Sequence, residues 1–135
     1  MPPDEPFDAA AETRRALAVG VGIRPGTPAA QIIAAIRAVI GPHPVACLAT
    51  IDRRATEPGF RSAAAELGVP VYSFTTAELS SVQVPNPSAR TTTALGVPGV
   101  AEAAALLAGT GPLLFPRQVI GTVVIAAACP GPVVP

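Results

Sequence analysis

One arginine stands in a glycine-rich turn near the start of the chain, where it could bind an anion. The turn contains Gly22, Arg24 and Gly26 and is followed by Thr27. Glycines let a ligand approach the backbone closely, and a helix that begins after the turn would offer free N–H groups to a negative charge. Arg24 would add a full positive charge. The turn therefore predicts an anion site; the alternative is a tight strand-to-helix connection whose arginine is only solvated.

The spacing of the glycines argues against a dinucleotide site. Gly20, Gly22 and Gly26 are similar to the fingerprint of such sites, but the third glycine comes one residue too late. The first acidic residue after the turn is Asp52, which lies farther along the chain than the acidic residue that binds a ribose. All nine basic residues are arginines, so a P-loop lysine and a Schiff-base lysine are excluded.

A second charged group follows the next apolar stretch of the chain. Thr50, Asp52, Arg54 and Glu57 occur within eight residues. The carboxyl ends of neighbouring parallel strands share one edge of a sheet, so we expect this group to lie near Arg24. It predicts a charged pocket in which Asp52 or Glu57 moves protons or orients an arginine. The alternative is helix capping by Glu57 and an ion pair between Asp52 and an arginine.

Other reactive residues indicate little chemistry. Glu102 stands in the first turns of a predicted helix, with the same two interpretations as Glu57. His43 is the only histidine and precedes the second predicted strand, at the opposite end of the sheet, so no nucleophile–histidine pair can form. Cys47 and Cys129 lie in apolar runs, where thiols are usually inert. We therefore expect no metal and no cofactor, and Asp52, Glu57 and Glu102 are the catalytic candidates if the protein is an enzyme.

Composition restricts the class of protein. The nine acidic residues balance the nine arginines, which argues against nucleic acid or an anionic membrane as a partner. The longest apolar run, from about Val119 to Cys129, is too short to span a bilayer. The N-terminus is acidic and proline-rich, unlike a signal peptide, and we therefore expect a cytoplasmic protein.

Hydrophobic periodicity supplies the elements that position these residues. Apolar runs predict strands over 16–23, 45–51 and 69–74. Between them we expect helices that start at Pro28, with Thr27 as N-cap, and at Pro58, and that end at Gly41 and Gly68. A capping-box pattern at Thr75 and Glu78 predicts a brief helix to about Ser81. Alternating strands and helices imply parallel crossovers and a sheet covered on both faces.

The second half of the chain departs from this alternation. Residues 81–96 predict a long ordered loop, followed by a helix over 99–108 and strands over 112–115 and 119–128. Only Pro116, Arg117 and Gln118 separate these strands, which predicts an antiparallel hairpin. The expected fold is a three-layer α/β/α domain over residues 14–135, with a mixed, mostly parallel sheet ending in that hairpin. Residues 1–13 are expected to form a flexible tail, with a short helical piece over 8–15.

Several segments in series resemble one family, the CobE proteins of cobalamin biosynthesis and the C-terminal domain of CbiG. They are Gly20-Val-Gly-Ile-Arg24-Pro-Gly-Thr27, Ala49-Thr50-Ile-Asp52-Arg-Arg54-Ala-Thr-Glu57-Pro-Gly, Ser88, Gly96-Val-Pro-Gly-Val-Ala-Glu102-Ala-Ala-Ala and Arg117. Their order and spacing match over roughly residues 16–129. This chain departs from the family pattern, which often has lysine where Arg54 and Arg117 stand. An arginine can keep an anion-binding role at these positions, but not a role that needs a neutral amine. The chain resembles the stand-alone CobE form.

The resemblance implies a role in building the corrin ring. Corrin precursors are macrocycles with carboxylate side chains, which an arginine-lined crevice at the strand ends could hold. The implied ligand-binding residues are Gly22, Arg24, Gly26, Thr27, Thr50, Arg54, Ser88 and Arg117. The apolar ring would lie on the loop over 82–97 and on the start of the following helix.

Three functions stay open at the level of the sequence. The first is binding of a corrinoid intermediate without turnover. The second is a hydrolase similar to CbiG, a cobalt-precorrin-5A hydrolase that opens a lactone and releases acetaldehyde, with Asp52, Glu57 or Glu102 as acid or base. The third is a module that docks on other cobalamin-pathway enzymes through its proline-rich loop.

Overall fold

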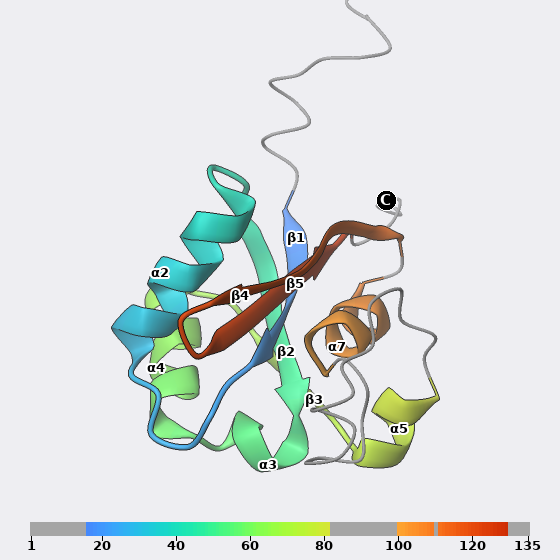
Figure 1. Cartoon of the computed structure of the whole chain (residues 1–135), viewed down its shortest axis with the longest axis horizontal. Coiled ribbons are helices and arrows are strands. Elements are labelled where there is room, and N and C mark those ends of the chain that lie inside the picture. The colour runs from blue at the N-terminus through green and yellow to red at the C-terminus, as the bar shows by residue number, and fades with distance from the viewer. Residues whose placement is uncertain (1–15, 82–99, 110, 130–135) are drawn as a thin grey trace, which may run out of the picture.

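A mixed β-sheet forms the centre of the molecule (Figure 1). The computed structural model describes residues 16–81, 100–109 and 111–129. Within these residues the strand order is β3-β2-β1-β5-β4. The elements in chain order are β1 (Leu17–Gly22), α2 (Ala29–Ile40), β2 (Val45–Ile51), α3 (Asp52–Ala55), α4 (Pro58–Leu67), β3 (Val71–Phe74), α5 (Thr76–Ser80), α7 (Val100–Ala108), β4 (Leu113–Ile120) and β5 (Val123–Ala128).

The strand directions confirm the predicted mixed sheet. Strand β2 pairs in parallel with both β1 and β3. Strand β5 pairs antiparallel with both β1 and β4, so β4 runs in the same direction as β1. The carboxyl ends of β1, β2 and β3 therefore lie at one edge of the sheet, where the predicted site residues follow β1 and β2.

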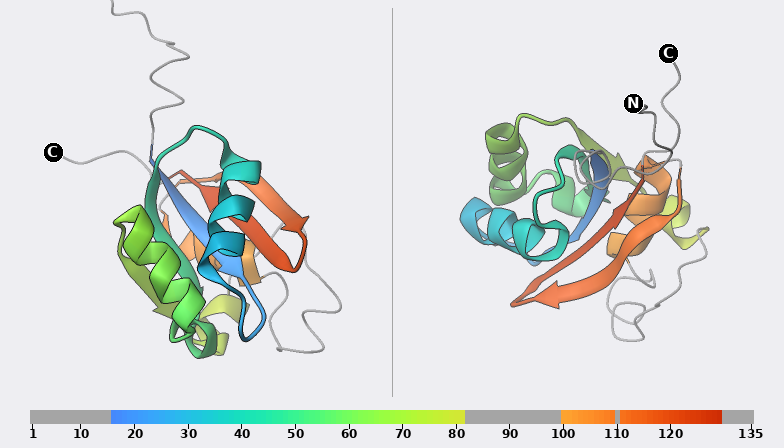
Figure 2. Two further views of the ribbon diagram at one scale, coloured as in Figure 1. Left: turned by 90° about the vertical axis from the view of Figure 1, so that its left-hand side faces the viewer. Right: turned by 90° about the horizontal axis from the view of Figure 1, so that it is seen from above.

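Helices cover both faces of the sheet, which confirms the three-layer arrangement (Figure 2). On one face, α2 and α4 bury Ile32, Ile36 and Phe60 in the core cluster that contains the β1 side chains. On the other face, α7 packs across β1, β2 and β5 with a surface composed mainly of alanine. Small side chains let this helix approach the sheet closely. No helix in the described part of the chain is long and apolar enough to cross a membrane.

The start of α2 differs from the prediction. We predicted Thr27 as the N-cap, but Pro28 holds that position in an extended conformation, and no side chain caps the helix. The hydroxyl of Thr27 instead donates to the carbonyl oxygen of Arg24 at 2.8 Å. Thr27 is buried, so its hydroxyl closes the preceding turn rather than the helix.

The hairpin forms, but its turn is not where we predicted it. Pro116, Arg117 and Gln118 belong to β4, and the turn consists of Gly121 and Thr122 between β4 and β5. Gly121 has a φ of 65°, which a glycine adopts without strain. Pro116 is tolerated because β4 is an edge strand whose register with β5 shifts between Phe115 and Gln118.

The remaining boundaries follow the sequence pattern within a few residues. Strand β3 begins at Val71 rather than at residue 69, and the predicted turn after β2 contains the one-turn helix α3. Helix α4 ends at Gly68 in a left-handed conformation, and Thr75 and Glu78 form the predicted capping box. The predicted tail, the helical piece over 8–15 and residues 82–96 of the predicted loop lie outside the described residues.

The close approach of α7 to β1 gives a test of this packing. A Cβ on Gly20 would lie 1.9 Å from the backbone oxygen of Ala101, so neither backbone can accommodate it. We expect Gly20→Ala to lower the free energy of unfolding by about 1–3 kcal/mol, measured by chemical denaturation. In the same strand, a Cβ on Gly22 would make an ordinary 3.4 Å contact with the side chain of Val124. Equal destabilisation by Gly20→Ala and Gly22→Ala would contradict the packing.

Candidate functional site

The turns that follow β1 and β2 lie against each other and form what we call the two-turn site, residues 22–28 and 50–57. The prediction that the second charged group lies near the first turn is supported by hydrogen bonds between them. The backbone N–H of Gly26 donates to Oε1 of Glu57 at 2.9 Å. Nε of Arg54 donates to the carbonyl oxygen of Ile23 at 3.1 Å. Two charged side chains of the second turn thus hold the backbone of the first.

A third hydrogen bond fixes the strands beneath the two turns. The hydroxyl of Thr50 donates to the carbonyl oxygen of Val21 at 2.6 Å, and Thr50 is completely buried. A buried hydroxyl without a partner costs about 1–3 kcal/mol. The bond to Val21 avoids this cost and also holds the ends of β1 and β2 in alignment. Thr50 is therefore a residue that supports the site from below rather than one that faces a ligand.

The starts of α2 and α4 are brought together by a close backbone contact. A Cβ on Gly59 would lie 1.9 Å from the carbonyl oxygen of Thr27, so glycine is required there. Neither helix has a side-chain cap or an acidic residue within its first turn. Their free N–H groups give both helix starts a partial positive charge. Glu57 is the N-cap residue of α4, but its carboxylate accepts from the N–H of Gly26 and leaves the first N–H groups of α4 without a side-chain acceptor.

Arg24 projects from the first turn into solvent. Its backbone oxygen accepts from both the N–H (3.3 Å) and the hydroxyl of Thr27, which fixes the turn around it. Within the described ranges its guanidinium has no hydrogen bond or ion pair, and the residue is exposed. Arg24 is thus a free cation held on a rigid turn next to two helix starts.

Glu102 and Arg117 form a separate pair between α7 and β4. Glu102 is completely buried, and its Oε2 accepts from the backbone N–H of Arg117 at 2.9 Å. Nε of Arg117 is also buried and lacks a hydrogen-bond partner among the described residues. The structure therefore divides the predicted site residues into two groups. Ser88, the remaining predicted ligand-binding residue, lies outside the described ranges.

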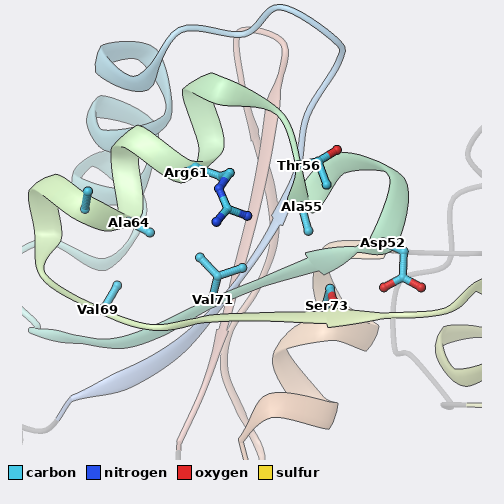
Figure 3. Close-up of a pocket in the computed structure, with 9 residues that line it drawn as sticks. Asp52, Ala55, Thr56, Arg61, Ala64, Val69, Val71 and Ser73 are labelled. Carbon is cyan, nitrogen blue, oxygen red and sulfur yellow. The ribbon is translucent and has the colours of Figure 1, made fainter.

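A surface hollow between α4 and β3 was not predicted from the sequence (Figure 3). We call it the α4–β3 hollow; it has a volume of about 720 Å³, and its polar residues are Asp52, Thr56, Arg61 and Ser73. Of these residues, the sequence predicts only Asp52 as a site residue. Arg61 lies off the apolar stripe of α4, which is equally typical of a solvated helix residue, so the sequence does not single it out.

The cysteines and the histidine take structural positions. Cys47 is buried, and desolvation raises the pKa of its thiol despite an opposing hydrogen bond with the backbone of Val19. A thiol with a raised pKa stays protonated near neutral pH and is a poor nucleophile. The ring of His43 packs edge-on against Phe115, with 5.6 Å between the ring centroids. Across the described stretches, no three His, Cys, Asp or Glu residues are grouped as metal ligands.

Comparison with known proteins relates this chain to proteins of cobalamin biosynthesis. The family model described as the cobalamin synthesis G C-terminus matches residues 17–128. Protein CobE from Sinorhizobium sp. is 34% identical over 119 residues, which cover 82% of this chain and 77% of that protein. A crystal structure of CobE, described as a protein from the cobalamin (vitamin B12) biosynthetic pathway, superimposes with a TM-score of 0.76 at 33% identity, covering 84% of this chain and 89% of the other.

Two further crystal structures share the fold. The cobalamin biosynthesis protein chiG from Agrobacterium tumefaciens is 32% identical with a TM-score of 0.64, over 86% of this chain and 99% of that one. A cobalamin biosynthesis protein G homolog from Sulfolobus solfataricus has a TM-score of 0.65 at 20% identity. The match covers 85% of this chain and 37% of the Sulfolobus chain, and at this identity it speaks only for the fold.

The contact between Glu57 and Gly26 can be tested directly. Glu57→Ala removes the acceptor for the Gly26 amide, and we expect hydrogen exchange at that amide to become about tenfold faster, measured by NMR. Glu57→Gln keeps a neutral acceptor and should give a smaller increase. Glu66→Ala changes an exposed glutamate of α4 outside the two-turn site and should leave Gly26 unchanged. An unchanged exchange rate in Glu57→Ala would mean that the bond does not hold the turn.

Proposed function

This chain belongs to the cobalamin synthesis G C-terminus family, and we propose that it binds a polycarboxylate corrinoid intermediate of cobalamin biosynthesis at the two-turn site. The observation that carries this proposal is the unpaired, exposed guanidinium of Arg24 on the turn that leads to α2, whose start, like that of α4, has no side-chain cap in the described structure. A corrin precursor bears several carboxylates around one ring, so it can engage several such positive groups together.

The binding groups differ in what they can offer a carboxylate. Arg24 has a complete planar fork, which can bind both oxygens of one carboxylate. Arg54 uses Nε to hold the carbonyl oxygen of Ile23, which leaves its two terminal amino groups as donors. The starts of α2 and α4 add N–H groups and partial charge. Because the turns are held by hydrogen bonds, their backbone N–H groups lose little conformational freedom when a ligand binds.

Arg117 extends the proposed ligand contacts beyond the two turns. Its Nε is buried without an acceptor among the described residues, whereas the residue as a whole is partly exposed, so its terminal amino groups are the donors that could meet a ligand. A ring with peripheral carboxylates presents acceptors in several directions. We therefore assign Arg117 a separate carboxylate of the same ligand, with its strand position fixed by Glu102.

The state of the carboxylates favours binding over turnover. Glu57 accepts from the N–H of Gly26, and Glu102 accepts from the N–H of Arg117, so both position backbone groups. A general acid or base must instead exchange protons with the substrate. The third candidate, Asp52, borders the α4–β3 hollow rather than the contact between the two turns.

One observation supports the alternative, a hydrolase similar to CbiG. Glu102 is a completely buried carboxylate, and such groups are common in active sites. Incubation with a lactone-bearing precursor should then release acetaldehyde, and Glu102→Gln should abolish the release while the fold is retained in circular dichroism. Unaltered precursor after incubation with the unmodified protein would reject the hydrolase.

Titration with a corrinoid acid tests the binding proposal. We expect saturable changes in the visible absorbance of the ligand and co-elution with the protein. Arg24→Gln should weaken binding by about tenfold, because one charge-assisted contact with a carboxylate is lost. The fully amidated form of the same corrinoid should bind more weakly than the acid, because it offers no negative charge.

A matched variant separates this effect from a general loss of charge. Arg37 is exposed and lies in the last turn of α2, at the opposite end of that helix from Arg24. Arg37→Gln should leave the affinity unchanged. The absence of spectral change and co-elution, or equal losses in Arg24→Gln and Arg37→Gln, would reject the two-turn site as the place of binding.

A further inference from the structure

The α4–β3 hollow adjoins the two-turn site, with which it shares Asp52, Ala55 and Thr56, and extends from there between α4 and β3. Its inner wall is apolar, with Ala55 and Ala64 buried and Val69 and Val71 half-buried. Its volume of about 720 Å³ falls within the range of known ligand pockets, about 300–1,000 Å³. The single turn α3 separates the two regions, since Arg54 reaches toward β1 while Asp52 borders the hollow.

The hollow carries one residue of each charge sign. Arg61 comes from α4 and points into the hollow, whereas Asp52 comes from α3 at its other end (Figure 3). Both residues are exposed, and in the described part of the chain neither side chain has a hydrogen bond or ion pair. Two unpaired opposite charges therefore border the same hollow, which Thr56 and Ser73 also line.

This arrangement selects the charge pattern of a ligand. A simple anion that binds Arg61 would gain nothing from Asp52, and a simple cation would gain nothing from Arg61. A molecule with a carboxylate at one end and an ammonium group at the other can pair with both residues while its carbon chain lies in the hollow between them. We infer that the α4–β3 hollow is a binding site for a small dipolar molecule of this class. The inference does not depend on corrinoid binding at the two-turn site.

A series of ω-amino carboxylic acids of increasing chain length provides the probe. Binding is followed by NMR through the methyl resonances of Val69 and Val71 in the full chain. We expect saturable shifts for the chain length that spans Arg61 and Asp52. Its affinity should exceed that of the alkyl carboxylate and of the alkylamine of equal length by about tenfold, because each of these lacks one charged contact.

Two variants assign the contacts, and two matched variants control for charge. Arg61→Gln and Asp52→Asn should each lower the affinity about tenfold, to that of the corresponding singly charged compound. Arg53→Gln and Glu66→Gln alter exposed residues of α3 and α4 that do not line the hollow, and they should have no effect. Arg24→Gln, which weakens corrinoid binding in the proposal above, should also leave these methyl shifts unchanged.

Three outcomes would overturn the inference. They are the absence of saturable shifts across the whole series, equal affinity for dipolar and singly charged compounds, and undiminished binding in Arg61→Gln. Failure of corrinoid titration with intact binding of a dipolar molecule would reject the two-turn proposal alone, so the two sites are tested separately.

Discussion

The burial of β1 on both of its faces is the constraint on which the rest of the structure depends. Leu17, Val19 and Val21 are inaccessible to solvent and lie in the core cluster shared with α2 and α4. On the opposite face, Gly20 leaves room for the backbone of α7 at Ala101. Because side chains alternate along a strand, a slip of one residue would place valine against α7 and glycine in the core. The register of β1 therefore fixes where the first turn of the site emerges.

The two-turn site is held in place by hydrogen bonds that connect it to the ends of β1 and β2. Thr50 joins the ends of β1 and β2, and Glu57 and Arg54 then hold the first turn by its backbone. Glu57 and Arg54 therefore use some of their hydrogen-bonding groups within the protein, and these groups are not available to a ligand. Arg24 remains free in the described structure and is the group best placed for a ligand carboxylate.

The two edges of the sheet differ in a way that bears on function. The β4 edge is interrupted by Pro116 and by an irregular register, both of which discourage pairing with another strand. The β3 edge is short, and Val71 and Ser73 line the α4–β3 hollow beside it. The hollow thus lies at the β3 side of the sheet, where no further strand follows β3 within the described residues. Its polar residues come from α3, α4 and β3, which meet only in the folded chain.

The α/β class, the positions of most helices and strands, and the proximity of the two charged turns could all be predicted from the amino-acid sequence. Apolar periodicity and the signals at Pro58, Gly41 and Gly68 are local properties, and the rule that parallel strands share a carboxyl edge is general. The hydrogen-bond partners of individual polar groups could not be predicted and became clear from the folded structure. Thr27 closes a turn instead of capping α2, and Pro116 lies within an edge strand. Glu57 binds an amide 31 residues away in sequence, and Arg61 shares a hollow with Asp52. These contacts form only when segments that are distant in sequence pack together, so a local sequence pattern does not predict them.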